Sequence, residues 1–478
     1  MKELKMFIAG KFIDNTSGKW INVLNPSTEK IIAKMPDGSV EDAQKGIDAA
    51  EKAQEAWEKT PAVQRASYLI KIAKGIRKRE KELTETIVKE GGKTLDLANT
   101  EVLFTADYLD YMAGWARRYE GEIIPSDRPN ETIMLFKKAI GVTTGILPWN
   151  FPFFLIARKT APALITGNTI VIKPSQLTPI NAYIFAQIVE ESGLPAGVFN
   201  LVNGRGSVVG SELASNSKVG MVSLTGSLEA GIQTMEAASK NITKVSLELG
   251  GKAPAIVLPD ADLDLAVKSI VASRIINTGQ VCNCVERVYV HKSIKPAFME
   301  KLITAMKAVK AGDPSIVKDL DMGPLIDAKS LEAVQQKVKK AIRQGAKLVL
   351  GGNRIGTKGY FFEPTILDNV IQKMDIIQEE TFGPVLPVVE YEQLDEAITW
   401  ANDCQYGLTS SIYTQNLNTA FKLIRALKFG ETYINRENFE TMQGFHAGWR
   451  KSGIGGADGK HGLEEYLQTQ VVYLETQQ

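Results

Sequence analysis

Along the N-terminal part of the chain, apolar residues recur at intervals of three and four, which is the spacing of one face of a helix. Ser39 and Asp42 have the pattern of a capping box, and apolar side chains then continue at helical spacing as far as Trp57. Two further amphipathic stretches follow, at about 65–82 and 100–119. This part of the chain is therefore predicted to be rich in helices.

The pattern changes between residues 122 and 140 to runs typical of β-strands, broken by a turn-rich segment at 126–130. These runs predict a hairpin with both strands in one sheet. Residues 466–474 also have the pattern of a strand, but one with no room for a sheet of its own. This strand needs a partner, either the hairpin or the sheet of another subunit.

From residue 142 onward, short apolar strands alternate with helices. Predicted strands at 170–173 and 198–202 flank a predicted helix at 180–192. After Lys252 the rhythm begins again with a strand at 253–257. Alternating strands and helices are typical of a parallel sheet. We therefore predict an α/β fold with two parallel-sheet α/β domains.

The composition narrows the class of ligand. Hydrophobic residues make up 44% of the chain and charged residues 23%, the balance of a soluble globular protein with a sizeable core. Lys and Arg number 56 against 55 Asp and Glu, so the formal net charge is +1. No field of one sign is available to hold a nucleic acid or a membrane surface. We therefore expect a small-molecule ligand, with neither nucleic acid nor membrane as a partner.

The three cysteines are too few for a disulfide framework in a chain of 478 residues. The N-terminus has no apolar run of signal-peptide length, and no stretch of 18 consecutive apolar residues occurs anywhere. These features predict a cytoplasmic protein with reduced thiols. The three histidines are scattered without metal-ligand spacing, so we expect no metal site.

Cys282 is the first candidate for chemistry. It is flanked by Gly, Gln and Asn rather than by a packed apolar stripe. A cysteine in such a segment can lie where backbone amides are free to meet a substrate oxyanion. The alternative at this point is a small buried thiol beside a helix end.

Two further segments supply a possible base and a hydrogen-bond donor. Glu248 interrupts an otherwise apolar strand, VSLELGG. A carboxylate is costly to bury in such a strand, so one interpretation is that it acts as a general base. The alternative is an ordinary outward-facing residue of a half-exposed strand. The glycines at 250–251 permit a turn that can aim this carboxylate at the cysteine.

Asn150 stands between Pro148 and Pro152, so its amide is held in a stiffened loop. That amide either donates to an oxyanion or satisfies a turn.

Two glycine-containing segments are candidates for cofactor binding. Residues 204–210 follow a strand and open a helix, but their spacing, GxGxxxG, is not the dinucleotide fingerprint. Residues 225–231 also lie between a strand and a helix, and their backbone N–H groups and the Ser227 hydroxyl can bind a pyrophosphate. Lys173 ends a predicted strand, where a ligand lies over a parallel sheet.

Taken together, these segments resemble the aldehyde dehydrogenase superfamily over essentially the whole chain. Seven blocks carry the resemblance in the same order and spacing: PWNFP, KPSQ, TGSxxxG, LELGGK, NTGQVCNC, EETFGPV and YGLTSS. Two longer segments, TADYLDYMAGWARRYEGE and YINRENFETMQGFHAGWRKSGIGG, are most similar to members that oxidise lactaldehyde or glycolaldehyde.

The resemblance implies a mechanism for oxidising a short hydroxyaldehyde to its carboxylic acid. Cys282, rather than Cys284, matches the nucleophile that forms a thiohemiacetal and then a thioester. Glu248 matches the base that activates the hydrolytic water. Asn150 matches the side-chain oxyanion donor, paired with the backbone N–H of Cys282.

The resemblance also implies a nicotinamide cofactor. Residues that match family contacts to it are Trp149, Lys173, Gly226, Ser227, Gly231, Glu380 and Phe382, the last two at the nicotinamide ribose and ring. NAD-preferring members often place a Glu on the adenosine ribose where this chain has Gln176. A neutral side chain removes the repulsion of a 2′-phosphate. NAD is therefore the expected cofactor, with NADP as the alternative.

The substrate pocket is expected to be polar. Arg158, Asn283, Glu440 and His446 stand on segments that reach the substrate mouth in the family's layout. Polar pockets suit short hydroxyaldehydes because unmet buried donors penalise an apolar ligand. Alternatively, each of these side chains only braces the loop at 435–448.

Three other functions remain as alternatives. The same mechanism can oxidise another aldehyde, such as glyceraldehyde or succinate semialdehyde. A cysteine hydrolase can pair Cys282 with His446, and a family member can lose catalysis altogether. NAD reduction that depends on Cys282 excludes the last two.

The resemblance implies three structural parts. Residues 1–120 and 141–250 form a Rossmann-like NAD(P)-binding domain, residues 251–450 form the catalytic domain, and residues 121–140 and 451–478 form a β oligomerisation arm. Homodimers or homotetramers are the expected assembly.

Overall fold

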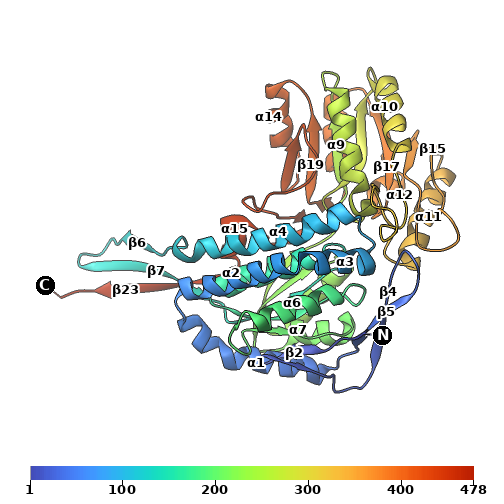
Figure 1. Ribbon diagram of the computed structural model, residues 1–478. Helices are drawn as coiled ribbons and strands as arrows, with labels where there is room; N and C mark the ends of the chain where they lie inside the picture. The colour runs from blue at the N-terminus through green and yellow to red at the C-terminus, as the bar shows by residue number, and fades with distance from the viewer. Residues whose placement is uncertain (1, 478) are drawn as a thin grey trace.

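The computed structural model describes residues 2–477 as a mixed α/β protein with two large sheets (Figure 1). The first sheet has eight strands, and its five central strands are parallel. Its strands run in the order β22 (Gly453–Ile454), β12 (Lys244–Glu248), β11 (Val219–Thr225), β8 (Val142–Ile146), β9 (Thr169–Lys173), β10 (Phe199–Leu201), β2 (Met6–Ile8) and β3 (Lys11–Ile13). The alternation after residue 142 thus forms the parallel sheet that it predicts.

Helices of the N-terminal half accompany this sheet: α1 (Val40–Lys59), α2 (Ala62–Lys78), α3 (Glu80–Gly91), α4 (Leu95–Ala113), α5 (Pro152–Ile165), α6 (Ile180–Glu191), α7 (Ser211–Ser215) and α8 (Leu228–Ser239). The predicted capping box is confirmed, because Ser39 accepts from the Asp42 backbone and Asp42 accepts from the Ser39 backbone. Every residue of α5 is buried. This helix carries Arg158 and begins two residues after Asn150, so it holds Arg158 on a rigid element and anchors the end of the Asn150 loop.

The second large sheet has seven strands, in the order β15 (Lys347–Leu350), β16 (Thr365–Asp368), β17 (Val385–Tyr391), β14 (Val285–His291), β13 (Ala253–Val257), β19 (Thr409–Tyr413) and β20 (Glu431–Ile434). Only β15 runs antiparallel to its neighbour. Its helices include α9 (Leu263–Ile275), α10 (Lys295–Lys307), α11 (Ala328–Arg343), α12 (Asp375–Gln378), α13 (Leu394–Asn402) and α14 (Leu417–Ala426). The short helix α15 (Gly459–Glu464) precedes the last strand.

A three-stranded antiparallel sheet projects from the body (left in Figure 1). It consists of β6 (Glu122–Pro125), β7 (Glu131–Ala139) and β23 (Leu467–Glu475). The register pairs β23 with β7 along their full lengths, from Leu467 opposite Ala139 to Glu475 opposite Glu131. The partner of the C-terminal strand is therefore the hairpin of the same chain.

Strands also occur where the sequence pattern predicted no element. Besides β2 and β3, the N-terminal segment forms β1 (Lys2–Glu3), β4 (Trp20–Leu24) and β5 (Ile31–Pro36) in a small separate sheet. The strand β22 lies within the segment expected to belong to the arm, yet it pairs with the edge strand β12 of the eight-stranded sheet. In the described chain, no helix combines the length and apolar character needed to cross a membrane.

Candidate active site

Two cavities meet at Cys282. The first spans about 700 Å³ and the second about 590 Å³, and both volumes include space open to solvent. Asn150, Thr225 and Cys282 line both of them. Thr225 is the last residue of β11, and Glu248, which lines the second cavity, is the last residue of β12. The site therefore lies at the carboxyl ends of parallel strands, where ligands of open α/β sheets bind.

The loop that carries Cys282 has a strained backbone. Asn277 and Thr278 adopt left-handed conformations, with φ of 46° and 60°. Such residues cost on the order of 1–3 kcal/mol each and persist only where the surroundings hold them. Gln280 supplies part of this hold, because its amide donates to the Asn277 carbonyl (2.9 Å) and accepts from the Ile326 backbone (2.9 Å). The strain is thus fixed directly beside the predicted nucleophile.

The structure separates the two neighbouring thiols. Cys282 is half-buried and lines both cavities, whereas Cys284 is buried and its thiol donates to the Val281 carbonyl. Burial raises the pKa of Cys284 to about 12. Burial also raises the pKa of Cys282, although the neighbouring His446 opposes this rise. Of this pair, only Cys282 is placed to meet a ligand.

The amide of Asn150 is held against the cysteine loop. Its Nδ2 donates to the Gln280 carbonyl at 3.0 Å, and the Asn277 side chain donates to the Asn150 carbonyl at 3.2 Å. An amide nitrogen carries two hydrogens, so one remains for a ligand at Cys282. The arrangement fits the predicted oxyanion donor.

Glu248 faces a histidine. Its Oε2 lies 3.1 Å from Nε2 of His446, and Nδ1 of the same ring lies 2.5 Å from Oε1 of Glu431. Burial alone lowers the pKa of His446, but the two carboxylates outweigh it and raise this pKa well above its usual value. The ring is therefore an imidazolium at neutral pH. The predicted turn at 250–251 also lies against the nucleophile, because a side chain on Gly251 would overlap the carbonyl of Cys282.

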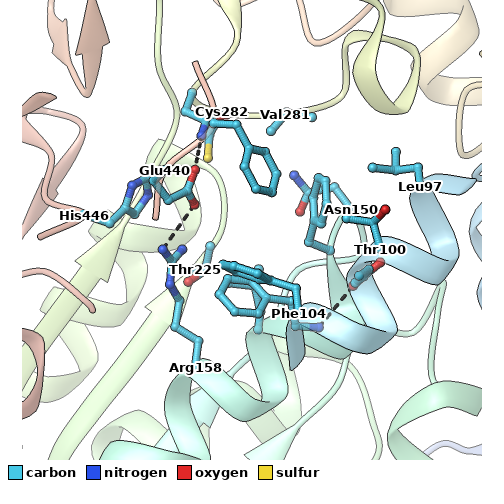
Figure 2. Close-up of a pocket in the computed structure, with 16 residues that line it drawn as sticks. Leu97, Thr100, Phe104, Asn150, Arg158, Thr225, Val281, Cys282, Glu440 and His446 are labelled. Carbon is cyan, nitrogen blue, oxygen red and sulfur yellow. Dashed lines mark hydrogen bonds and ion pairs between the residues drawn. The ribbon is translucent and has the colours of Figure 1, made fainter. Parts of the chain in front are cut away.

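A network of polar side chains forms one end of the first cavity. Glu440 accepts from Asn283 at 2.5 Å and from Arg158 at 3.2 Å, and Arg158 also pairs with Asp458. Both Arg158 and Asp458 are buried. Figure 2 shows Arg158, Glu440 and His446 on one side of the cavity, with Cys282 at its top. The four predicted substrate residues thus line one cavity.

Much of the remaining lining of this cavity is apolar, and sequence reasoning did not identify it. Leu97 and Phe104 come from α4, Phe154 from α5, and Phe439 from the loop that also carries Glu440. Phe104 is central, because its ring lies 4.8 Å from that of Phe154 and 5.9 Å from that of Phe439. Apolar residues on an amphipathic helix give the same pattern whether they face a core or a pocket.

The second cavity collects most of the predicted cofactor residues: Trp149, Gly226, Ser227, Glu380 and Phe382. Ser227 caps α8 by accepting from the Ala230 backbone. The rings of Trp149 and Phe382 meet edge to face at 5.6 Å, and Glu380 accepts from the Gly251 backbone at 2.8 Å. Burial raises the pKa of Glu380 to about 7.

Lys173, Gln176 and Gly231 do not line this cavity. Lys173 is buried at the end of β9 and donates to the backbone carbonyls of Pro174 and Gly204, and burial lowers its pKa to about 8. Gln176 is exposed in the next loop. Gly231 allows α8 to pack closely, since a Cβ there would lie 2.6 Å from Leu249.

The second cavity fits a nicotinamide cofactor. It begins at the N-terminus of a twelve-residue helix, α8, and ends at Cys282. The buried hydroxyl of Thr225, which lines it, has no hydrogen-bond partner within residues 2–477. Gly250 leaves room for the Glu380 carboxylate, because a Cβ there would lie 2.6 Å from Oε2.

Comparison with known proteins agrees with this geometry. The model of the aldehyde dehydrogenase family matches residues 12–472. Lactaldehyde dehydrogenase of Escherichia coli K12 is 66% identical over 471 residues, covering 98% of each chain, and a crystal structure of the E. coli enzyme superposes with a TM-score of 0.98 over 99% of both chains. D-glyceraldehyde dehydrogenase (NADP(+)) of Thermoplasma acidophilum is 38% identical, covering 99% of this chain and 96% of its own.

A structure of 3,6-anhydro-L-galactose dehydrogenase in complex with NAP is 42% identical, with a TM-score of 0.97 over 99% of this chain and all of the other. These relatives are matched over nearly their whole length, so both sheets and both cavities fall inside the likeness. The chain belongs to the aldehyde dehydrogenase family.

Proposed function

We propose that this enzyme oxidises a short hydroxyaldehyde, such as lactaldehyde or glycolaldehyde, to its carboxylic acid, with NAD as cofactor and NADP as the alternative. One observation carries the proposal: Cys282 lies where a substrate-sized cavity with a polar end meets a cavity at the N-terminus of α8. The likeness to lactaldehyde dehydrogenase supports the same substrate class.

The polar end of the first cavity favours a hydroxyl-bearing substrate. Arg158, Asn283 and Glu440 are joined by hydrogen bonds and are largely withdrawn from water. An alkyl aldehyde offers these desolvated groups no hydrogen-bond partner, whereas a substrate hydroxyl can both donate and accept a hydrogen bond. Glyceraldehyde and succinate semialdehyde stay as alternative substrates, and the first is oxidised by a relative.

The first chemical step is attack by Cys282 on the aldehyde carbon. Attack requires the thiolate, which burial disfavours and the imidazolium of His446 favours. The oxyanion that forms is stabilised by the second hydrogen of the Asn150 amide and by the Cys282 backbone N–H. A nicotinamide cofactor, when bound, supplies the acceptor for the hydride that leaves this carbon.

The second step is hydrolysis of the thioester on Cys282. Glu248 lines the same cavity as the thiol and takes a proton from water as that water attacks the thioester carbon. The C–S bond breaks, the acid leaves and the thiol is restored. Trp149, Gly226, Ser227, Glu380 and Phe382 hold the cofactor beside Cys282, while Lys173 and Gln176 reach its adenosine end.

A cysteine hydrolase built on Cys282 and His446 has no comparable support. Such an enzyme needs no nicotinamide, so it leaves the second cavity, with its lining of Trp149, Glu380 and Phe382, without a role. A non-catalytic role gives no reason for Cys282, Glu248 and Asn150 to converge on one cavity junction.

The projecting sheet supports assembly into a dimer or tetramer. Ile123 is 75% exposed and Tyr473 is 66% exposed on this sheet. Apolar side chains exposed along a sheet with a free edge are typical of a surface that another chain covers.

The test is absorbance of reduced nicotinamide when purified enzyme is supplied with NAD or NADP and a panel of hydroxy-, alkyl- and semialdehydes. We expect turnover to be fastest for lactaldehyde or glycolaldehyde. Cys282→Ala should abolish it, whereas Cys284→Ala, the matched control, should retain it. Activity confined to alkyl aldehydes or semialdehydes would overturn the substrate proposal, and activity that survives Cys282→Ala would overturn the mechanism.

A further inference from the structure

A buried cluster of three charged side chains lies outside both cavities. Glu286, on β14, pairs with Lys252 at 2.6 Å and with Arg274 at 2.8 Å, and all three side chains have at most 1% of their surface exposed. Burial raises the pKa of Glu286, but the two cations outweigh it and lower this pKa to about 2. The carboxylate is therefore ionised and almost fully withdrawn from solvent.

The rest of the hydrogen-bonding capacity of Glu286 goes to one loop. Its Oε2 accepts from the Thr381 backbone at 2.9 Å, and its Oε1 accepts from the Phe382 backbone at 3.2 Å. This loop also carries Glu380. Phe382 has a φ of 54°, so its backbone needs an external hold. A single carboxylate thus supports the segment that presents Glu380 and Phe382 to the second cavity.

The same cluster reaches the cysteine loop from its other side. Arg274 donates to the carbonyls of Val285 (2.8 Å) and Gly279, which flank Cys282 in the chain. The cysteine loop and the Glu380 loop touch directly, because a side chain on Gly279 would overlap the carbonyl of Gly383. The cluster therefore contacts both the loop that carries the nucleophile and the loop that carries Glu380 and Phe382.

We propose that Glu286 is a positioning residue that sets Glu380 and Phe382 at the correct distance from the Cys282 loop for a nicotinamide cofactor. The proposal rests on the nicotinamide-dependent function proposed above. If Glu286 only stabilised the fold, its loss would lower stability and would affect cofactor binding and the chemistry of Cys282 to the same extent.

Glu286→Gln is the sharpest variant because it conserves shape. A Gln amide has one acceptor oxygen where the carboxylate has two. In either orientation its NH₂ group faces a backbone N–H of the loop, at Thr381 or at Phe382. That amide loses its acceptor and the loop moves. Glu286→Asp keeps the charge but shortens the reach by one methylene, so it tests position separately and serves if the Gln variant does not fold.

Glu101 offers a matched control on the other side of the site. It is also buried, paired with a buried lysine, Lys93, and it accepts from two backbone amides, Phe153 (2.9 Å) and Phe154 (3.1 Å). Those amides open α5, which follows Asn150 and lines the first cavity. Both amides bond to one oxygen, Oε1, which the oxygen of a Gln could replace, so Glu101→Leu is the variant that removes these acceptors from the substrate side.

The experiment compares two readouts for the wild-type enzyme and the variants. The first is the Kd for NADH and NADPH, measured by their fluorescence without aldehyde. The second is hydrolysis of p-nitrophenyl acetate without cofactor, which needs Cys282 attack and thioester hydrolysis only. We expect both Glu286 variants to raise the Kd at least about tenfold while ester hydrolysis stays within about threefold of wild type. Glu101→Leu should give the reverse pattern.

Equal Kd values for wild type and both Glu286 variants would overturn the inference, as would equal losses in the two readouts. Failure of the proposed function has a different signature. In that case the wild-type enzyme itself binds neither NADH nor NADPH.

Discussion

Nε2 of His446 lies 3.1 Å from Oε2 of Glu248, so the proposed water-activating base is paired with a buried cation. Oε2 of Glu248 lies within ion-pair distance, but neither carboxylate oxygen has a hydrogen-bond partner among the described residues. This contact is therefore electrostatic and leaves both oxygens able to accept from a water molecule. The same ring contacts Glu431 and influences the thiol of Cys282, so one histidine links the nucleophile to its base.

This pairing predicts a pH dependence of stability. The pKa of His446 is raised in the folded chain, so above the unfolded value of about 6.5 the folded state binds more protons than the unfolded state. The stabilisation is complete below that value and is lost as pH rises through the folded pKa. The difference in Tm between wild type and His446→Asn should therefore be largest near pH 6 and should shrink as the pH is raised through the folded pKa. A difference that is constant with pH would contradict the assignment.

Glu248→Gln should separate the two chemical steps. A Gln side chain cannot take a proton from water, so the thioester on Cys282 should form but hydrolyse slowly. We expect a burst of reduced nicotinamide equivalent to the enzyme present, followed by turnover lowered by about 10²–10⁴-fold. Stopped-flow absorbance measures the burst, and intact mass detects the acylated chain. A variant without a burst would place Glu248 in the first step instead.

The local patterns of the sequence predicted many of the elements between residues 39 and 257, together with the C-terminal strand. The capping box at Ser39 involves residues three apart, and the alternation after residue 142 reports strands buried on both faces. The N-terminal strands had no such signal, because they are short and gain their stability from pairing with distant partners. Leu4, for example, bonds to Lys34, and Leu201 of β10 pairs with Phe7.

The site was predicted one side chain at a time, but its partnerships were not. Asp458 pairs with Arg158 across 300 positions, and Glu431 pairs with a histidine on a separate loop. Glu286 lies in a strand with the ordinary pattern of a buried element. Nothing local to these acidic residues distinguishes them from charges on a solvated face, so only the folded arrangement identifies them.

Glu440→Gln should weaken discrimination in favour of hydroxyaldehydes. Glu440 alone joins Asn283 to Arg158, and Gln retains only one acceptor for them. Arg158 keeps its pairing with Asp458, so the fold should persist. We expect the ratio of kcat/KM for lactaldehyde to that for propanal to fall about tenfold or more, as when a hydrogen bond to a charged group is lost. An unchanged ratio would remove Glu440 from the recognition of the substrate hydroxyl.

Gln176→Glu tests the cofactor assignment. A carboxylate at this exposed position should repel the 2′-phosphate of NADP while leaving the hydroxyl of NAD unaffected. We expect kcat/KM for NADP to fall at least about tenfold and that for NAD to change less than about threefold. Because Gln176 is exposed, Tm should not move. Parallel losses with both cofactors would show that residue 176 does not face the 2′ position.

The arm makes the last prediction, which concerns assembly. On the projecting sheet (Figure 1), Ile123 stands on the edge strand β6 and Tyr473 on β23. Both side chains are mostly exposed in the single chain. If another copy covers this sheet, a buried charge there costs more than most interfaces can offset. The double variant Ile123→Asp, Tyr473→Asp should therefore have a lower mass by light scattering than the wild-type oligomer. Ile316→Asp is the matched control, since Ile316 is 78% exposed but lies outside the arm. Equal masses for all three proteins would exclude the arm as the interface.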